Sequence, residues 1–120
     1  MKMRRFIIEM GMGNDQYGMD YQKAAARAIE SAMRRSAIPM FATTGLSHED
    51  MHVNVTVAVQ EPDKLNTEAL GKRMPRGQAK VTAVHGGQNV QNLDTGDTIV
   101  VATAAIEAFF ADQSTLWLSD

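Results

Sequence analysis

MHVNVTVAVQ, residues 51–60, is the stretch that decides the fold. Its apolar positions alternate with polar or small ones, and they are Val53, Val55, Val57 and Val59. Because successive side chains of a strand point to opposite faces of a sheet, this period of two predicts a half-buried strand.

The sequence before this strand predicts a strand, a turn and a helix. Residues 6–10 are apolar and β-branched, and the glycine-rich residues 11–15 predict a turn after them. From residue 20 to residue 35 small apolar residues recur at steps of three and four, which indicates an amphipathic helix with Asp20 as N-cap. Its alanine-rich face favours close packing against a sheet. Residues 41–46 are compatible with a loop or an edge strand.

The sequence after it predicts a second helix and two more strands. A shorter helix is expected at residues 65–74, capped by Asp63 or Asn66, and an alternating strand at residues 80–85. Residues 89–97 are turn-rich. Residues 98–110 begin with a run that is apolar on both faces, which is typical of a central strand. Residues 111–120 fit either a terminal strand or a docked tail.

The order β-α-β-α-β-β predicts an α+β fold, with a mixed four-stranded sheet and two helices on one face. A length of 120 residues suits one domain spanning residues 1–120. We expect the valine-rich strands to leave an uncovered sheet face, and the simplest cover for such a face is another copy of the chain. The expected partner is therefore the chain itself, in a homo-oligomer.

Composition excludes several classes of function. The formal net charge is -2, so the chain lacks the surplus of basic residues that nucleic-acid binding usually requires, and no nucleic-acid partner is expected. The absence of cysteine excludes disulfides, thiolate nucleophiles and sulfur-ligated zinc or iron clusters. Glu9 interrupts the N-terminal apolar run well short of a signal peptide or a membrane span, so we expect a cytoplasmic protein with no membrane partner.

Residues 11–28, GMGNDQYGMDYQKAAARA, resemble the signature of a bacterial family of conserved hypothetical proteins of about this length. The resemblance extends to residues 51–53, 85–87, 96–97 and 102–107, and it implies no established activity. The chain departs from the family pattern at Tyr17, where the pattern has histidine, and at Gln22, where it has threonine.

The element order is also similar to the chorismate mutase-like trimeric fold. Reactive-imine deaminases and the repeat domains of ring-opening amidohydrolases such as cyanuric acid hydrolase share that fold. This topological similarity implies a trimer with ligand clefts between subunits, and it assigns no function.

The candidate catalytic residues are Asp15, Lys23 and His85. Lys23 lies in the first turn of the expected helix, where its charge opposes the helix dipole, and Arg27 follows one turn later. The two cations could be solvated, with Asp20 or Glu30 as partner. Alternatively they line a subunit cleft with Asp15 and hold a small anionic or carbonyl-bearing metabolite.

The candidate ligand-binding residues are Gly11, Gly13, Gly18, Asp20, Arg27, Gly86 and Gly87. The first three belong to a polar loop ahead of a helix, which could hold an anion or simply form a tight turn. His85 ends a strand beside two glycines. Its ring could serve as acid, base or oxyanion donor, or hydrogen-bond to the turn.

Residues 48–52, HEDMH, match the H-E-x-x-H string of zinc proteases, which requires a helix. Here a strand is expected instead, so His48 and His52 would be about 13 Å apart, far beyond the span of one tetrahedral zinc, and Glu49 would not be placed as in that motif. A zinc hydrolase is therefore disfavoured, and no metal or cofactor is expected. Two functions remain open. One is a small-molecule hydrolase or isomerase with sites between subunits, and the other is a non-catalytic ligand-binding or structural oligomeric module.

Overall fold

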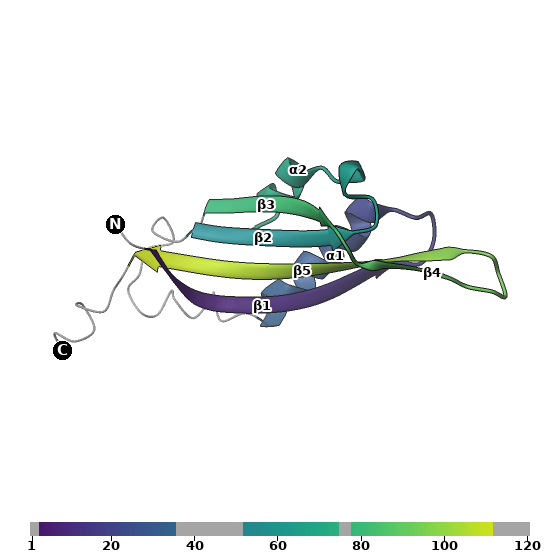
Figure 1. Cartoon of the computed structure of the whole chain (residues 1–120), viewed down its shortest axis with the longest axis horizontal. Helices are drawn as coiled ribbons and strands as arrows, with labels where there is room; N and C mark the ends of the chain where they lie inside the picture. Colours follow the sequence, from purple (N-terminus) through teal and green to yellow (C-terminus); the bar gives the residue numbers. More distant parts are fainter. Residues whose placement is uncertain (1–2, 36–51, 75–77, 112–120) are drawn as a thin grey trace.

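The computed structural model describes residues 3–35, 52–74 and 78–111 (Figure 1). His48, Glu49, residues 41–46 and nearly all of the C-terminal tail lie outside the described residues. The elements are β1 (Met3–Asp15), α1 (Tyr21–Arg35), β2 (His52–Val59), the short 3₁₀ helix η3 (Pro62–Lys64), α2 (Thr67–Lys72), β3 (Gln78–His85), β4 (Gln88–Gln91) and β5 (Thr98–Ala111).

The strands form one mixed sheet in the order β1-β5-β2-β3. β5 pairs antiparallel with β1 and with β2, and β2 pairs parallel with β3. The predicted α+β class and the central position of the strand after residue 98 are confirmed. The described part of the sheet has five strands and not four, because β4 pairs with β5 beyond the end of β2. The similarity to the chorismate mutase-like fold stays a prediction.

Both helices lie on one face of the sheet, which we call the inner face. α1 runs behind the strands in Figure 1 and contacts β1, β5 and β2, while α2 contacts β3. The four alternating valines of β2 point to this face and are at most 1% exposed. The expectation that valines form the uncovered face was therefore wrong, because the protein's own helices bury them.

β1 is longer than the sequence predicted. Residues 11–15 continue the strand and pair with β5, so the turn predicted there was wrong. A Cβ atom on Gly13 would lie 2.3 Å from the backbone nitrogen of Ala28, and one on Gly11 would lie 2.3 Å from that of Ala32. These glycines let the alanine face of α1 approach the strand backbone, which is a tertiary reason for glycine inside a strand.

The helix boundaries follow the expected caps. The Oδ1 atom of Asp20 accepts a hydrogen bond from the backbone N–H of Lys23 at 3.0 Å, so Asp20 caps α1 as predicted. The second helix is shorter than expected, and its N-cap is Asn66, whose side chain accepts from the N–H of Ala69. His52 opens β2 with an exposed side chain, so the H-E-x-x-H string does not end on a helix.

The opposite, outer face of the sheet is not covered by any described element. The edge strand β1 places its large apolar side chains there, Ile8, Met10 and Met12, which are 51%, 61% and 63% exposed. Beside Met10 and Met12 the neighbouring positions on β5 and β2 are small, and cross-strand partners run through Ala105, Thr103, Thr56 and Ala58 to Thr82 and Val84 on β3. Ile8 instead pairs with Glu107, which forms an ion pair with Arg5. The outer face is thus a ridge beside a shallow trough.

Candidate functional site

Asp15 is the last residue of β1 and the only buried charged residue among those described, at 3% exposure. Its Oδ2 atom accepts the backbone N–H of Asp20 at 2.9 Å. The intervening loop turns sharply, with positive φ at Gly18 and Met19. Asp15 therefore closes the loop that delivers the chain from the sheet to the start of α1.

Lys23 and Arg27 approach the same carboxylate from α1. The Lys23 Nζ and Arg27 Nη1 atoms lie 3.9 and 3.8 Å from Asp15 Oδ1, and Arg27 Nη1 also donates to the carbonyl of Asn14 at 2.7 Å. The shared carboxylate relieves the repulsion between the two cations. Both side chains are about half exposed, so each ion pair contributes only about 0–1 kcal/mol.

Asp15, Lys23, Arg27 and Asp20 are thus brought together, as the candidate-site hypothesis required. Sequence reasoning offered Asp20 or Glu30 as the acidic partner of Lys23, whereas the structure gives Asp15. That partner lies in a different element and is brought to α1 by the sheet, so helix spacing alone could not identify it.

A groove runs along the exposed side of α1 toward the C-terminal end of α2. Its polar part, of about 390 Å³, and its apolar part, of about 480 Å³, share Ala26, Glu30 and Arg73. We call this surface the α1 groove; it is lined by Asp20, Gln22, Lys23, Ala26, Arg27, Ile29, Glu30, Met33, Arg34, Arg73 and Met74. An ion pair between Arg73 and Glu30 at 3.4 Å crosses it. The lining carries four cations and two carboxylates.

His85 does not join this cluster within one chain. It ends β3, and β5 and β2 separate β3 from β1 in the sheet. Three strand spacings of about 4.8 Å place its backbone roughly 14 Å from that of Asp15, beyond hydrogen-bonding reach. A site that used both residues would require a second subunit.

The candidate glycines have structural roles. Gly11 and Gly13 are covered by α1, as described above, and Gly18 forms the exposed turn with no atom within 4 Å of a Cβ position. Gly86 donates its N–H to the carbonyl of Val59 at 2.9 Å, so this amide is already used and is not a free oxyanion donor. The Gln60 side chain donates to the carbonyl oxygens of both Gly86 and Gly87, and it fixes the turn into β4.

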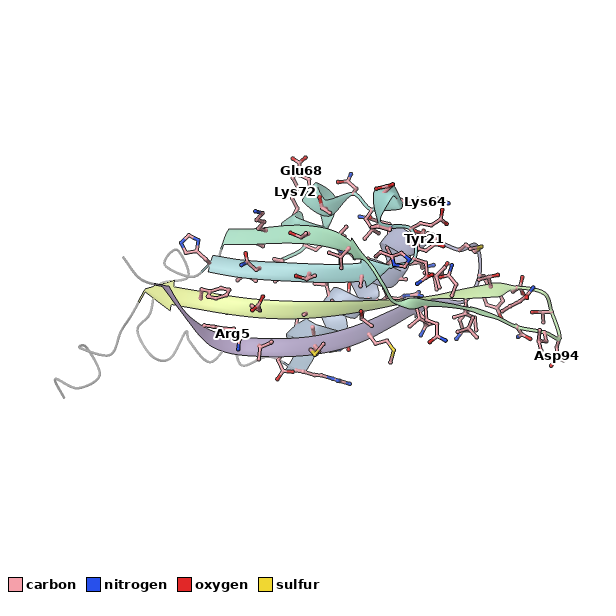
Figure 2. All side chains as sticks on the ribbon, in the orientation of Figure 1. Arg5, Tyr21, Lys64, Glu68, Lys72 and Asp94 are labelled. Carbon is pink, nitrogen blue, oxygen red and sulfur yellow. The ribbon has the colours of Figure 1, made fainter. Side chains whose placement is uncertain are left out.

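Sequence reasoning missed a second polar cluster around Tyr21. The buried Tyr21 hydroxyl accepts from Asn89 Nδ2 at 2.8 Å. A hydrogen bond with Tyr21 lowers the pKa of the Glu61 carboxyl below 4.5; slight desolvation opposes this shift, and the Lys64 ammonium adds to it. Lys64 also lies 5.5 Å from the Tyr21 ring centre (Figure 2). The apolar helix pattern indicated burial of Tyr21 but gave no signal for its distant partners.

In residues 3–35, 52–74 and 78–111, no group of three or more His, Asp or Glu side chains is placed to hold a metal ion. Among the helices of the same ranges, none has the length and apolar character that crossing a membrane requires.

Comparison with known protein families identifies the family of this chain. Residues 5–108 match the profile of a conserved hypothetical protein family, Lin0512_fam. The chain belongs to this family. A crystal structure of an FtsZ-like protein of unknown function from Nostoc punctiforme is 35% identical, with a TM-score of 0.79. The alignment covers 93% of this chain and 99% of that protein. No match was found among curated proteins.

Proposed function

We propose that this Lin0512_fam member is a self-associating structural module, and that the outer face of the sheet is its interface. The observation that carries the proposal is the row of Ile8, Met10 and Met12, each more than half exposed on an edge strand. Scattered apolar residues are normal on a surface, but a contiguous apolar patch on a sheet is typical of an interface. The FtsZ-like protein from Nostoc punctiforme is itself of unknown function, so the proposal depends on this face of the sheet.

The size of the face is adequate for a specific contact. β2 and β3 have eight residues each, so the face is about 26 Å long at 3.3 Å per residue. Four strands at about 4.8 Å give a width of roughly 19 Å. The footprint is then about 500 Å² per copy, or about 1,000 Å² for two, which is the lower bound for a stable interface.

The shape of the face suits a two-fold pair. The ridge of Met10 and Met12 lies at one edge, and the trough of Ala105, Thr103 and Ala58 lies beside it. In a two-fold arrangement each copy inserts its ridge into the trough of the other, because such an interface uses the same surface on both partners. The proposed unit is a dimer, in place of the trimer that the fold resemblance implied.

The test is sedimentation equilibrium of the protein and two variants at 10 µM protein in 300 mM NaCl, where a salt-sensitive contact between other surfaces contributes least. Wild type is expected at twice the 13.1 kDa chain mass. Met10→Glu puts a carboxylate at the centre of the ridge, and burying an unpaired charge is costly enough to give a monomer. Ala69→Glu is the control, because it adds the same charge at an exposed position on α2. A monomeric wild type, or a Met10→Glu variant as dimeric as wild type, would refute the proposal.

A small-molecule hydrolase or isomerase is the second candidate, favoured by the loosely held Lys23 and Arg27 beside Asp15. A ligand in the α1 groove would raise the melting temperature by mass action. If this candidate is right, at least one member of a panel of anionic and carbonyl-bearing metabolites should raise the melting temperature, and Lys23→Ala should abolish that rise. No shift across the panel would remove this candidate. The dimer would stand, because the outer face does not include the groove.

A further inference from the structure

The hairpin formed by β4 and the start of β5 extends away from the rest of the sheet (Figure 1). At its base Asn89 bonds to the buried Tyr21, so the hairpin is anchored to the body. We call residues 92–97 the arm tip. Asp94 lies there, far from the helices (Figure 2).

The arm tip is exposed but well ordered by its own hydrogen bonds. Asn92 donates its N–H to the carbonyl of Asp97 and accepts from the N–H of Gly96, both at 2.7 Å. The Asn92 side chain also accepts from the N–H of Asp94 at 3.0 Å. A loop held in one conformation loses little entropy on binding. The tip is therefore preorganised to bind a partner.

The chemistry of the tip is distinctive. Leu93 is 89% exposed, the most exposed large apolar residue among those described. Asp94 and Asp97 lie close to it in sequence, and the tip contains no cation. A partner for this tip must therefore offer an apolar hollow with positive charges at its rim.

The α1 groove has that chemistry. Ile29 and Met74 line its apolar part, and Arg34 and Arg73 line the same hollow. This hollow carries two cations, Arg34 and Arg73, against one carboxylate, Glu30, so it has an excess of positive charge for the two carboxylates of the tip. The Arg73 side chain is about half exposed, and its 3.4 Å contact with Glu30 is a long one, so it can turn toward another carboxylate at small cost.

The geometry points to a head-to-tail contact between copies, in which the arm tip of one chain docks in the α1 groove of another. Leu93 enters the apolar part of the groove, and Asp94 and Asp97 face Arg73 and Arg34. Because tip and groove are different surfaces, each chain keeps one of each after the contact forms. The contact therefore generates rings or open chains, and it goes beyond the two-fold pair without depending on it.

The test uses Met10→Glu as background, so that the outer face does not contribute. Sedimentation is measured between 10 µM and 1 mM of this protein, in 20 mM and in 300 mM NaCl. We expect the average mass to rise with protein concentration at low salt. At high salt the association constant should fall at least about threefold, since salt screens charges at a polar rim. A background protein that stays monomeric at 1 mM in 20 mM NaCl would overturn the inference.

Variants then identify the two surfaces. Asp94→Lys and Arg73→Glu should each weaken association about tenfold or more, and combining both in one chain should restore it. A mixture of the two single variants should also associate, because the intact tip of Arg73→Glu docks in the intact groove of Asp94→Lys, and the reversed tip meets the reversed groove in the other direction. Glu68→Lys is the control, since it reverses an exposed carboxylate outside both surfaces. Equal association of all these proteins would contradict the proposed contact.

The two proposals fail in different ways. If Met10→Glu leaves the mass of the wild type unchanged, the outer face is not the interface. If Met10→Glu dissociates the pair and no salt-sensitive association remains, the outer face is supported and the arm contact is wrong.

Discussion

Gly13→Ala is expected to be strongly destabilising, although it adds one methyl group. The new Cβ would lie 2.3 Å from the Ala28 nitrogen and 2.5 Å from the Ala24 carbonyl oxygen, whereas ordinary contact begins at 3.4 Å. Both neighbours are backbone atoms of α1, so no side-chain rotation relieves the clash. The whole helix must retreat by roughly 1 Å.

The cost follows from the gap that this movement opens. α1 has 15 residues, so it is about 22 Å long and about 10 Å wide, and a 1 Å retreat leaves about 220 Å³ of empty space. At about 24 cal/mol per Å³ this costs about 5 kcal/mol, or about half if the helix tilts. The lower chain entropy of alanine in the unfolded state returns about 0.4–1 kcal/mol. The net loss is about 2–5 kcal/mol, which lowers the melting temperature by roughly 8–20 °C.

Thermal and urea unfolding, followed by circular dichroism at one protein concentration, measure this loss. The control is Gly71→Ala in α2, where the new Cβ would meet the nearest atoms at 3.7 Å. There alanine is favoured in a helix by about 0.5–1 kcal/mol, so this variant should be slightly more stable than wild type. A Gly13→Ala melting temperature within 2 °C of wild type would refute the close approach of α1 to β1.

Substitutions at three further positions test the polar clusters. Asp15→Ala should cost about 1–3 kcal/mol in urea unfolding because the N–H of Asp20 loses its acceptor, while Asp15→Asn should keep most of the stability; equal losses would mean that the hydrogen bond is unimportant. Tyr21→Phe should cost about 1–3 kcal/mol by leaving the Asn89 amide without its acceptor, and an unchanged stability would contradict that bond. Because the pKa of Glu61 is lowered on folding, its contribution to stability is present above pH 4.5 and is lost as the pH falls through the lowered value. Glu61→Gln should therefore be less stable than wild type at pH 7 and equally stable in acid. A stability difference that persists in acid would show that the ionised Glu61 carboxylate is not its cause.

The parts of the fold that have local periodicity could be predicted from sequence. The alternating valines of β2 and the three-and-four spacing of α1 specify their elements, because burial on one face imposes those periods. β4 could not be predicted in this way. Three of its residues 88–91 are polar and the fourth, Val90, is 40% exposed, so β4 has no buried apolar residue to impose a pattern.

The candidate site was predictable only in part. Lys23 and Arg27 were identified by their unfavourable spacing on the helix, and that spacing does mark a place where a carboxylate is needed. The glycines of β1 were misassigned because a local turn and close helix contact both call for glycine. The separation of His85 from Asp15 depends on strand order, which no local pattern encodes.

Residues 10–13 of β1, Met-Gly-Met-Gly, give the strand two dissimilar sides. The glycine side admits α1 at backbone distance, and the methionine side forms the ridge of the outer face. A slip of one residue against β5 would exchange the two sides. The methionine side chains would then clash with α1, and the outer face would lose its ridge. This short repeat therefore disfavours misalignment of the edge strand by an odd number of residues, because each such state places methionine side chains where α1 packs.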